Sequence, residues 1–282
     1  MYLKTNSNAW KSMPNFQFNP NTARWQARNA LGMSMAADLA YRNEAEIKTT
    51  AAHWGFTRSN FIESPSGGEW DTQAFVASNA DAVLVAFRGT EPKELKDWIT
   101  DADVIFAHTE VGPVHYGFWA ALQSVWESLS QTINSHQDRG QSLWITGHSL
   151  GAALATLAVA RLRLNLKPIH SLYTYGSPRV GSLEFTDRFD QDFGDFTFRY
   201  VNNSDVVTRV ATRAMGYSHV GTSLTFDAAG TVHADMHFWN KLLERFKGNL
   251  DEFLHGKVAP FNDHAIANYV RNSEINLNRD PF

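Results

Sequence analysis

The sequence of 282 residues contains no cysteine, which excludes disulfides, thiolate catalysis and metal sites built on cysteine. It also lacks an apolar run of the roughly 20 residues that a membrane-spanning helix needs. The net charge is −4, and lysine and arginine are scattered, so the chain offers no broad basic surface for nucleic acid. We therefore expect neither a transmembrane segment nor a nucleic-acid partner.

The first residues are polar and show no signal peptide, so we expect a soluble protein that is either cytoplasmic or exported by a non-standard route. No repeat or linker divides the chain, and 43% hydrophobic residues suffice for a sizeable core. We expect one domain over residues 1–282, with residues 1–20 as a peripheral segment that Phe16 and Phe18 attach to the body. The sequence does not indicate an oligomeric state.

Short apolar runs predict a sheet. The strongest run, residues 82–87, is typical of a strand that is covered on both faces. Further strands are predicted near residues 61–62, 74–76, 142–146, 169–175, 196–201 and 222–226. An early helix with its cap at Asn21 or Thr22 would carry Trp25 on its apolar side. Strands that alternate with helical patterns favour an α/β fold with a mostly parallel central sheet flanked by helices.

A Gly-His-Ser-Leu-Gly segment at residues 147–151 follows one of these runs and precedes a stretch rich in alanine and leucine. This context predicts a strand, a sharp turn and a helix, the arrangement called a nucleophile elbow. Glycine on each side of the serine avoids collisions with the strand and the helix. A Gly-x-Ser-x-Gly pattern arises by chance in roughly one chain in ten of this length. The context therefore carries the prediction that Ser149 is a nucleophile with an exposed hydroxyl.

A serine nucleophile needs a histidine base and a carboxylate that orients it, and in elbow folds both follow the serine along the chain. Asp205 comes directly after the predicted strand at residues 196–201, where a parallel sheet delivers a loop to its carboxyl edge. Asp205 is therefore the first candidate for the acid. Asp227 and Asp235 are weaker alternatives in or beyond the late hairpin.

The histidines after Asp205 are His219, His233, His237, His255 and His264. His264 is predicted to begin a terminal helix, which would hold its ring in a fixed place, as a base requires. His219 precedes a strand and is expected to be packed, whereas His148 in the elbow has the wrong direction to act on Ser149. His233 and His237 have the spacing of a helical metal pair, but they lack a metalloprotease signature and an evident third ligand. We expect no metal and no cofactor.

Six segments, in the same order, resemble the class 3 lipases, a branch of the α/β-hydrolase fold. They are Ala-Phe-Arg-Gly-Thr at 86–90, Val-His-Tyr-Gly-Phe at 114–118, the pentapeptide at 147–151, Tyr-Gly-Ser-Pro-Arg-Val-Gly at 175–181, Asn-Asn-Ser-Asp-Val-Val at 202–207 and Asp-His at 263–264. The resemblance implies Ser149 as nucleophile, Asp205 as orienting acid and His264 as general acid and base.

The resemblance also implies an oxyanion hole and a lid. Thr90 would donate its backbone N–H and its hydroxyl, and the elbow geometry independently indicates the backbone N–H of Leu150 as the second donor. A short helical lid is implied at about residues 91–107, where Leu95, Trp98 and Ile99 fall on one helical face. Its opening at a lipid–water interface would expose an acyl-binding surface.

The sequence departs from the family pattern at Thr208, where many members have a proline, so the turn after the acid is expected to differ. The absence of cysteine also removes the disulfides of secreted fungal relatives. The sequence predicts a serine carboxylic-ester hydrolase, a lipase of acylglycerols, with phospholipase A1 or feruloyl esterase activity as the alternatives on this scaffold. A non-catalytic binding protein is a further alternative, which the full set of triad residues disfavours.

Overall fold

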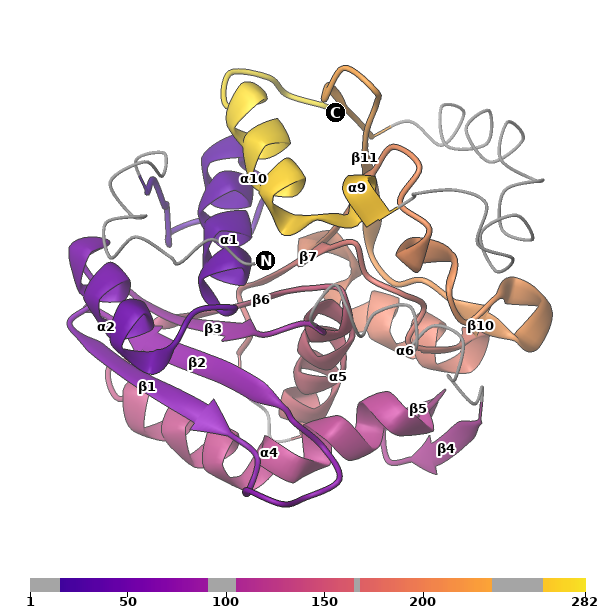
Figure 1. Ribbon diagram of the computed structural model, residues 1–282, viewed down its shortest axis with the longest axis horizontal. Coiled ribbons are helices and arrows are strands. Elements are labelled where there is room, and N and C mark those ends of the chain that lie inside the picture. The colour runs from indigo at the N-terminus through magenta and orange to yellow at the C-terminus, as the bar shows by residue number, and fades with distance from the viewer. Residues whose placement is uncertain (1–15, 91–104, 165–167, 235–260) are drawn as a thin grey trace.

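The computed structural model describes residues 16–90, 105–164, 168–234 and 261–282 (Figure 1). An eight-stranded sheet with the order β1-β2-β3-β6-β7-β9-β11-β12 runs through the centre. The strands from β3 to β11 in this order are parallel, and antiparallel pairs lie at both ends of the sheet. The strands are β1 (Arg58–Glu63), β2 (Gln73–Ser78), β3 (Ala82–Phe87), β6 (Ser142–His148), β7 (Ser171–Tyr175), β9 (Thr197–Asn202), β11 (Thr222–Phe226) and β12 (Val232–His233).

Helices cover both faces of the sheet, so the predicted α/β fold is confirmed (Figure 1). On one face lie α4 (Tyr116–His136) and α5 (Leu150–Leu164), and on the other lie α1 (Ala27–Leu39) and α10 (Ile266–Ile275). The remaining helices are α2 (Glu44–His53), α6 (Leu183–Phe193), α9 (Phe261–His264) and the short 3-10 helices η2 (Gly194–Phe196), η3 (Val207–Arg209) and η4 (Arg213–Met215).

The two faces of the sheet have different cores because successive side chains of a strand point to opposite faces. Leu143 and Ile145 of β6 belong to the cluster under α4 and α5, which is mostly aliphatic. Trp144 of β6, with Tyr173 and Tyr175 of β7, belongs to the cluster under α1, which is rich in aromatic rings. All six residues of β3 are buried, as expected for a strand covered on both faces.

The predicted start of the first helix is wrong. Helix α1 begins at Ala27 after an extended Gln26 that makes no side-chain cap, and Trp25 precedes the helix. Tertiary contacts determine this boundary: the Trp25 indole donates to the Tyr200 hydroxyl at 2.7 Å, and Asn29 inside the helix accepts from the backbone of Asn19 at 2.7 Å. These contacts override the local capping signal.

The N-terminal attachment by aromatic rings is confirmed for the residues that the structure describes. Phe16 stacks on Trp54 with ring centroids 4.4 Å apart, and Phe18 meets Trp144 edge-on at 4.7 Å. Both phenylalanines pack against the aromatic-rich cluster. Residues 16–18 therefore lie on the same face of the sheet as α1.

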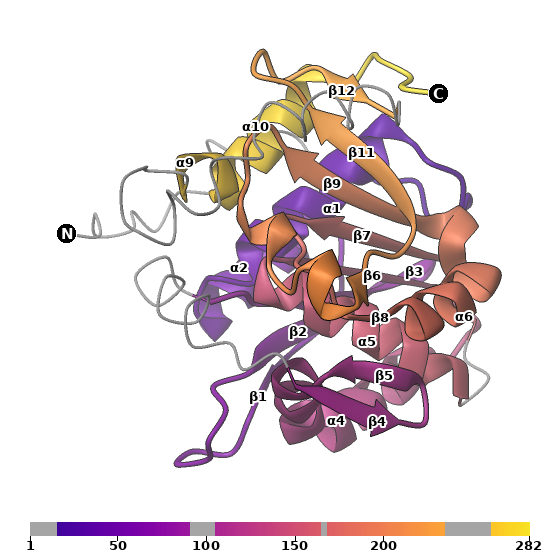
Figure 2. The ribbon, with the colours of Figure 1, turned by 90° about the vertical axis from the view of Figure 1, so that its right-hand side faces the viewer.

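A small second sheet was not predicted (Figure 2). It has the order β10-β8-β5-β4 and consists of β4 (Phe106–Thr109), β5 (Gly112–His115), β8 (Gly181–Ser182) and β10 (Tyr217–Ser218). Strands of two to four residues are too short to show an alternating pattern in the sequence. The main sheet, in contrast, brings the loops after β3, β6, β7 and β9 to one edge, where the candidate site lies.

Candidate active site

Ser149 occupies a strained turn between β6 and α5. Its φ is +58°, a left-handed conformation that a residue other than glycine rarely adopts. A Cβ at Gly147 would overlap the backbone of Gly151, and a Cβ at Gly151 would overlap the backbone of Phe87. The glycines are thus required by the close approach of β6, α5 and β3, as the elbow interpretation predicts.

The expected exposure of the serine is not observed. Ser149 is 0% exposed, and its hydroxyl has no hydrogen-bond partner among the described residues. Elbow geometry brings the serine to the edge of the sheet but does not keep that edge uncovered. A substrate can therefore reach Ser149 only after a local rearrangement.

Asp205 and His264 form a buried pair beside the elbow. Asp205 Oδ2 lies 2.8 Å from His264 Nδ1, and the two side chains are 0% and 4% exposed. Asp205 follows β9 by three residues, as predicted. His264 does not begin the terminal helix but ends α9, just before α10, because Ala265 has a non-helical conformation (φ −59°, ψ +129°) between them.

Several donors hold the carboxylate of Asp205. Its Oδ1 accepts the backbone N–H of Val207 at 2.9 Å, and its Oδ2 accepts the Tyr269 hydroxyl at 2.5 Å as well as His264. Thr208, at the position where many family members have proline, donates its hydroxyl to the Asp205 carbonyl at 2.8 Å. The turn after Asp205, which the sequence did not define, is therefore stabilised by this hydroxyl.

Gly176 lies against the pair and leaves room for it. Its φ is +62°, and a Cβ there would lie 2.8 Å from Asp205 Oδ2 and 2.9 Å from His264 Nδ1. Both distances are too short for a real Cβ contact. The glycine in the Tyr-Gly-Ser-Pro-Arg-Val-Gly segment thus has a steric reason that the sequence did not reveal.

The candidate mechanism transfers a proton between Ser149 Oγ and His264 Nε2. In the described part of the chain, neither Ser149 Oγ nor His264 Nε2 has a hydrogen-bond partner. Because the carboxylate of Asp205 can only accept, His264 Nδ1 carries its hydrogen and Nε2 is left as the acceptor of a neutral ring. Hydrogen bonds between catalytic groups often form fully only when substrate binds.

The predicted oxyanion donors lie next to the elbow. Leu150 is the first residue of α5, so its N–H has no partner within the helix and stands at the positive end of the helix dipole. Thr90 follows β3, which pairs with β6 up to Phe87 and Gly147. A Cβ at Gly89 would lie 3.1 Å from Ser149 Cβ, so the turn that carries Thr90 touches the serine.

The other candidate acids and bases are engaged elsewhere or lie outside the described residues. His219 Nε2 lies 2.8 Å from the Thr208 carbonyl, as expected of a packed histidine, and burial lowers its pKa well below the usual value. His233 pairs with Asp227 at 2.9 Å, at the far end of the sheet. Asp235, His237 and His255 lie outside the described residues. Within the described ranges, no three His, Asp or Glu side chains gather as a possible metal site.

The lid residues Leu95, Trp98 and Ile99 also lie outside the described residues. Of the expected lid region of about residues 91–107, the structure describes residues 105–107, and Phe106 and Ala107 belong to β4. The short apolar sequence around them gave no sign of this strand. Among the described helices, none combines the length and apolar character needed to cross a bilayer.

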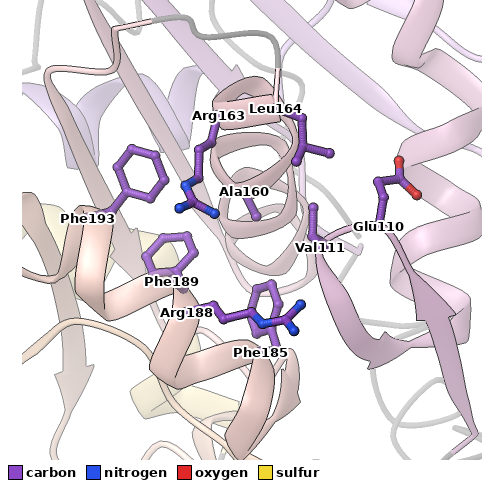
Figure 3. A pocket seen from close by; sticks show the side chains of 9 residues that line it. All are labelled: Glu110, Val111, Ala160, Arg163, Leu164, Phe185, Arg188, Phe189 and Phe193. Carbon is purple, nitrogen blue, oxygen red and sulfur yellow. The ribbon is translucent and has the colours of Figure 1, made fainter.

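The surface pocket of Figure 3 lies away from this site. Its lining comes from the last turns of α5, from α6 and from the turn at Glu110 and Val111. Ser149 lies at the opposite end of α5, about 16 Å of helix axis from Ala160. The two arginines at its rim are paired, Arg163 with Asp192 at 2.6 Å and Arg188 with Glu184 at 3.1 Å. The pocket is therefore not part of the candidate site.

Sequence reasoning missed three contributors to the site. Tyr269, Tyr41 and His148 all contact it through hydrogen bonds between distant segments. Tyr269 is the one aromatic residue of α10, but no local pattern indicates that its hydroxyl contacts Asp205. Only His148 had a signal, its place in the elbow, which we interpreted solely as evidence against a role as base.

A mostly parallel sheet, with a strained serine elbow after β6 and an Asp–His pair from later loops, defines the α/β-hydrolase fold. Comparison with known proteins points to one family. Residues 84–215 match the family model described as Lipase (class 3). This match and the relatives below show that the chain is similar to class 3 lipases and shares their fold.

Among relatives, a secreted mono- and diacylglycerol lipase A of Penicillium cyclopium is 34% identical over 159 residues, covering 53% of this chain and 50% of the relative. A chloroplastic phospholipase A(1), DAD1, of Arabidopsis thaliana is 27% identical over 234 residues, covering 69% and 52%. Among solved structures, a triacylglyceride lipase of Rhizomucor miehei superposes with a TM-score of 0.59 at 25% identity, covering 70% and 78%. The chain thus spans about half the length of the curated relatives it matches.

Proposed function

We propose that the protein is a serine carboxylic-ester hydrolase, with Ser149 as nucleophile, His264 as general acid and base, and Asp205 as orienting acid. The observation that carries the proposal is the buried Asp205–His264 hydrogen bond beside the strained elbow. In the neutral ring this bond selects the tautomer with Nε2 as acceptor, which is the form that removes a proton from a serine. The match of residues 84–215 to the class 3 lipase model supports the same assignment.

The chemistry follows from these positions. Ser149 Oγ attacks the ester carbonyl while His264 Nε2 takes its proton, and the N–H groups of Thr90 and Leu150 stabilise the oxyanion. His264 then donates the proton to the leaving alcohol, which leaves an acyl group on Ser149. Water, deprotonated by His264, attacks this acyl-enzyme and releases the acid. Asp205 stabilises the positive charge on His264 in both steps.

We propose acylglycerols as the substrate class, within one α/β-hydrolase domain over residues 1–282. The names of the Penicillium and Rhizomucor relatives support this choice. The burial of Ser149 supports action at a lipid–water interface, because a buried nucleophile needs an opening step before reaction. Leu95, Trp98 and Ile99 are the proposed apolar side of the segment that opens. Phospholipase A1 activity is the second candidate, favoured by the Arabidopsis relative.

The test compares the wild type with Ser149→Ala on triacylglycerol, diacylglycerol, phospholipid and feruloyl esters. We expect acylglycerols to be hydrolysed fastest by the wild type, with a rate increase when the substrate passes its micelle threshold, and no hydrolysis by Ser149→Ala. Preference for phospholipid or feruloyl esters would replace the substrate assignment. Full activity of Ser149→Ala would exclude the serine mechanism itself.

A further inference from the structure

The ring of His148, the residue before the candidate nucleophile, joins two distant segments. Its Nε2 lies 2.6 Å from the main-chain carbonyl oxygen of His264, and its Nδ1 lies 2.8 Å from the Tyr41 hydroxyl. A carbonyl can only accept, so Nε2 carries the hydrogen of the neutral ring. Nδ1 is then the acceptor, and Tyr41 donates to it. The two contacts together fix one tautomer.

The environment also fixes the charge of this ring. His148 is 4% exposed, and burial, together with the nearby His264, holds its pKa well below the usual value. The two imidazole rings lie 4.5 Å apart, so a charged His148 would repel the positive charge that forms on His264 during catalysis. A neutral donor at this position avoids that repulsion.

Among the described residues, the other hydrogen bonds of this segment hold His264 relative to the acid. The Asp263 carbonyl accepts the Asn202 side chain at 2.7 Å, and the Asp263 carboxylate accepts the Asn203 side chain at 3.1 Å. Asn202 is the last residue of β9, and Asn203 lies in the loop after β9 that also carries Asp205. The contact from His148, in contrast, starts at the elbow and therefore links the segment of the base to the segment of the nucleophile.

Tyr41 extends this connection to the oxyanion turn. A Cβ at Gly89 would overlap the Tyr41 hydroxyl, so this hydroxyl lies directly against the turn that carries Thr90. The segment with the nucleophile, the segment with the base and the turn with the oxyanion donor thus meet around one imidazole ring.

We infer that His148 is a positioning residue that holds His264 at proton-transfer distance from Ser149 through the His264 main-chain carbonyl. The inference rests on the proposed function. Removal of the Nε2 donor leaves a buried carbonyl without its partner and lets the base move away from the serine. The expected consequence is a lower kcat with an unchanged KM, because the contact does not involve the bound substrate.

The test compares His148→Phe, which keeps a ring but removes both nitrogens, with His148→Gln, whose amide can still donate to the carbonyl. With a soluble short-chain ester, we expect kcat to fall about tenfold in His148→Phe with an unchanged KM, and to be largely restored in His148→Gln. Tyr41→Phe, which keeps the donor but no longer fixes its tautomer, should have an intermediate kcat.

The matched control is His136→Phe. His136 is also buried, at 1% exposure, and also has one ring contact, from Nε2 to Asn60 Oδ1 at 2.8 Å, but it lies at the far end of α4. This variant should lose stability and keep the kcat of the wild type. Thermal unfolding identifies a temperature at which all variants are folded, and if His148→Phe does not fold, Tyr41→Phe and His148→Gln decide the question.

A wild-type kcat in His148→Phe would overturn the inference. If His148→Phe does not fold, a wild-type kcat in Tyr41→Phe would overturn it. So would a kcat in His148→Gln as low as that in His148→Phe. Ser149→Ala, assayed in parallel, distinguishes a failure of the positioning role of His148 from a failure of the proposed function. If Ser149→Ala is inactive while the His148 variants are fully active, only the positioning role fails; if Ser149→Ala is active, the proposed function fails and the inference fails with it.

Discussion

The elbow and the C-terminal segment bring the candidate nucleophile and the candidate base to the same place by different means. The position of Ser149 is set by backbone sterics, through its φ of +58° and through the glycines on either side, which allow β6, α5 and β3 to approach one another. The position of His264 is set by hydrogen bonds from residues far away in the sequence, among them Asn202 and His148.

This difference predicts different responses to mutation. A steric arrangement in a packed interior tolerates no additional atoms, so changes in the elbow should lower stability and activity together. Each hydrogen bond contributes modestly, so single losses around His264 should reduce the rate stepwise while the fold remains intact. Mutations in the elbow should therefore affect both folding and catalysis, whereas mutations around His264 should affect mainly catalysis.

The largest effect is expected for His264→Ala, which removes the base itself. We expect kcat on a soluble ester to fall by roughly 10⁴-fold or more, because triad members act as a unit. The measurement is steady-state hydrolysis. His233→Ala is the control, since it removes the histidine of another His–Asp pair, at 2.9 Å from Asp227, and should leave kcat unchanged. Comparable loss in both variants would contradict the assignment of the base.

Gly147→Ala tests the steric side of the comparison. The added Cβ would overlap the backbone of Gly151, so we expect a loss of about 3 kcal/mol in the free energy of unfolding, together with loss of activity. Denaturant unfolding measures the first and ester hydrolysis the second. Gly194→Ala is the control, because its nearest contact would be the Asp190 Cβ at 3.3 Å, and it should change stability little. Equal stability of the two variants would refute the steric account.

His115 allows the effect of acid on the fold to be separated from its effect on the site. Burial lowers the pKa of His115 from 6.5 to about 4, so the neutral ring contributes stability that is present above pH 6.5 and is lost as pH falls toward 4. His115 stacks on Phe118 at 4.2 Å, which a phenylalanine can also do. Between pH 7 and 5, His115→Phe should therefore lose about 2 kcal/mol less stability than the wild type. Identical pH dependence in both proteins would show that His115 does not contribute.

Tyr269→Phe tests the hydrogen-bonded side of the comparison. Its hydroxyl donates to Asp205 Oδ2 at 2.5 Å and accepts the backbone N–H of Asn202 at 3.0 Å. A hydrogen bond to a charged acceptor is stronger than a neutral one, so we expect kcat to fall about tenfold. Tyr175→Phe is the control, because that buried hydroxyl donates to the Ala30 carbonyl instead. If both variants have the same kcat, the bond to Asp205 does not affect catalysis.

The difference between the two regions also explains what the sequence could predict. The elbow, the central strands and the position of Asp205 depend on short stretches of chain, and each left a pattern in those stretches. The start of α1, the small sheet and the ends of α9 and α10 depend on tertiary contacts, and the predictions there were wrong or absent. Tyr269, Tyr41 and His148 belong to the second kind, because hydrogen bonds between distant residues have no local signature.

The most direct test of the proposed mechanism is covalent labelling with an organophosphonate, followed by mass-spectrometric mapping. We predict one adduct per chain, on Ser149, that forms in parallel with loss of ester hydrolysis and is nearly absent in His264→Ala. Micelles should accelerate labelling, because Ser149 is 0% exposed in the structure. An adduct on another residue, or full hydrolysis after Ser149 has been labelled, would contradict the account.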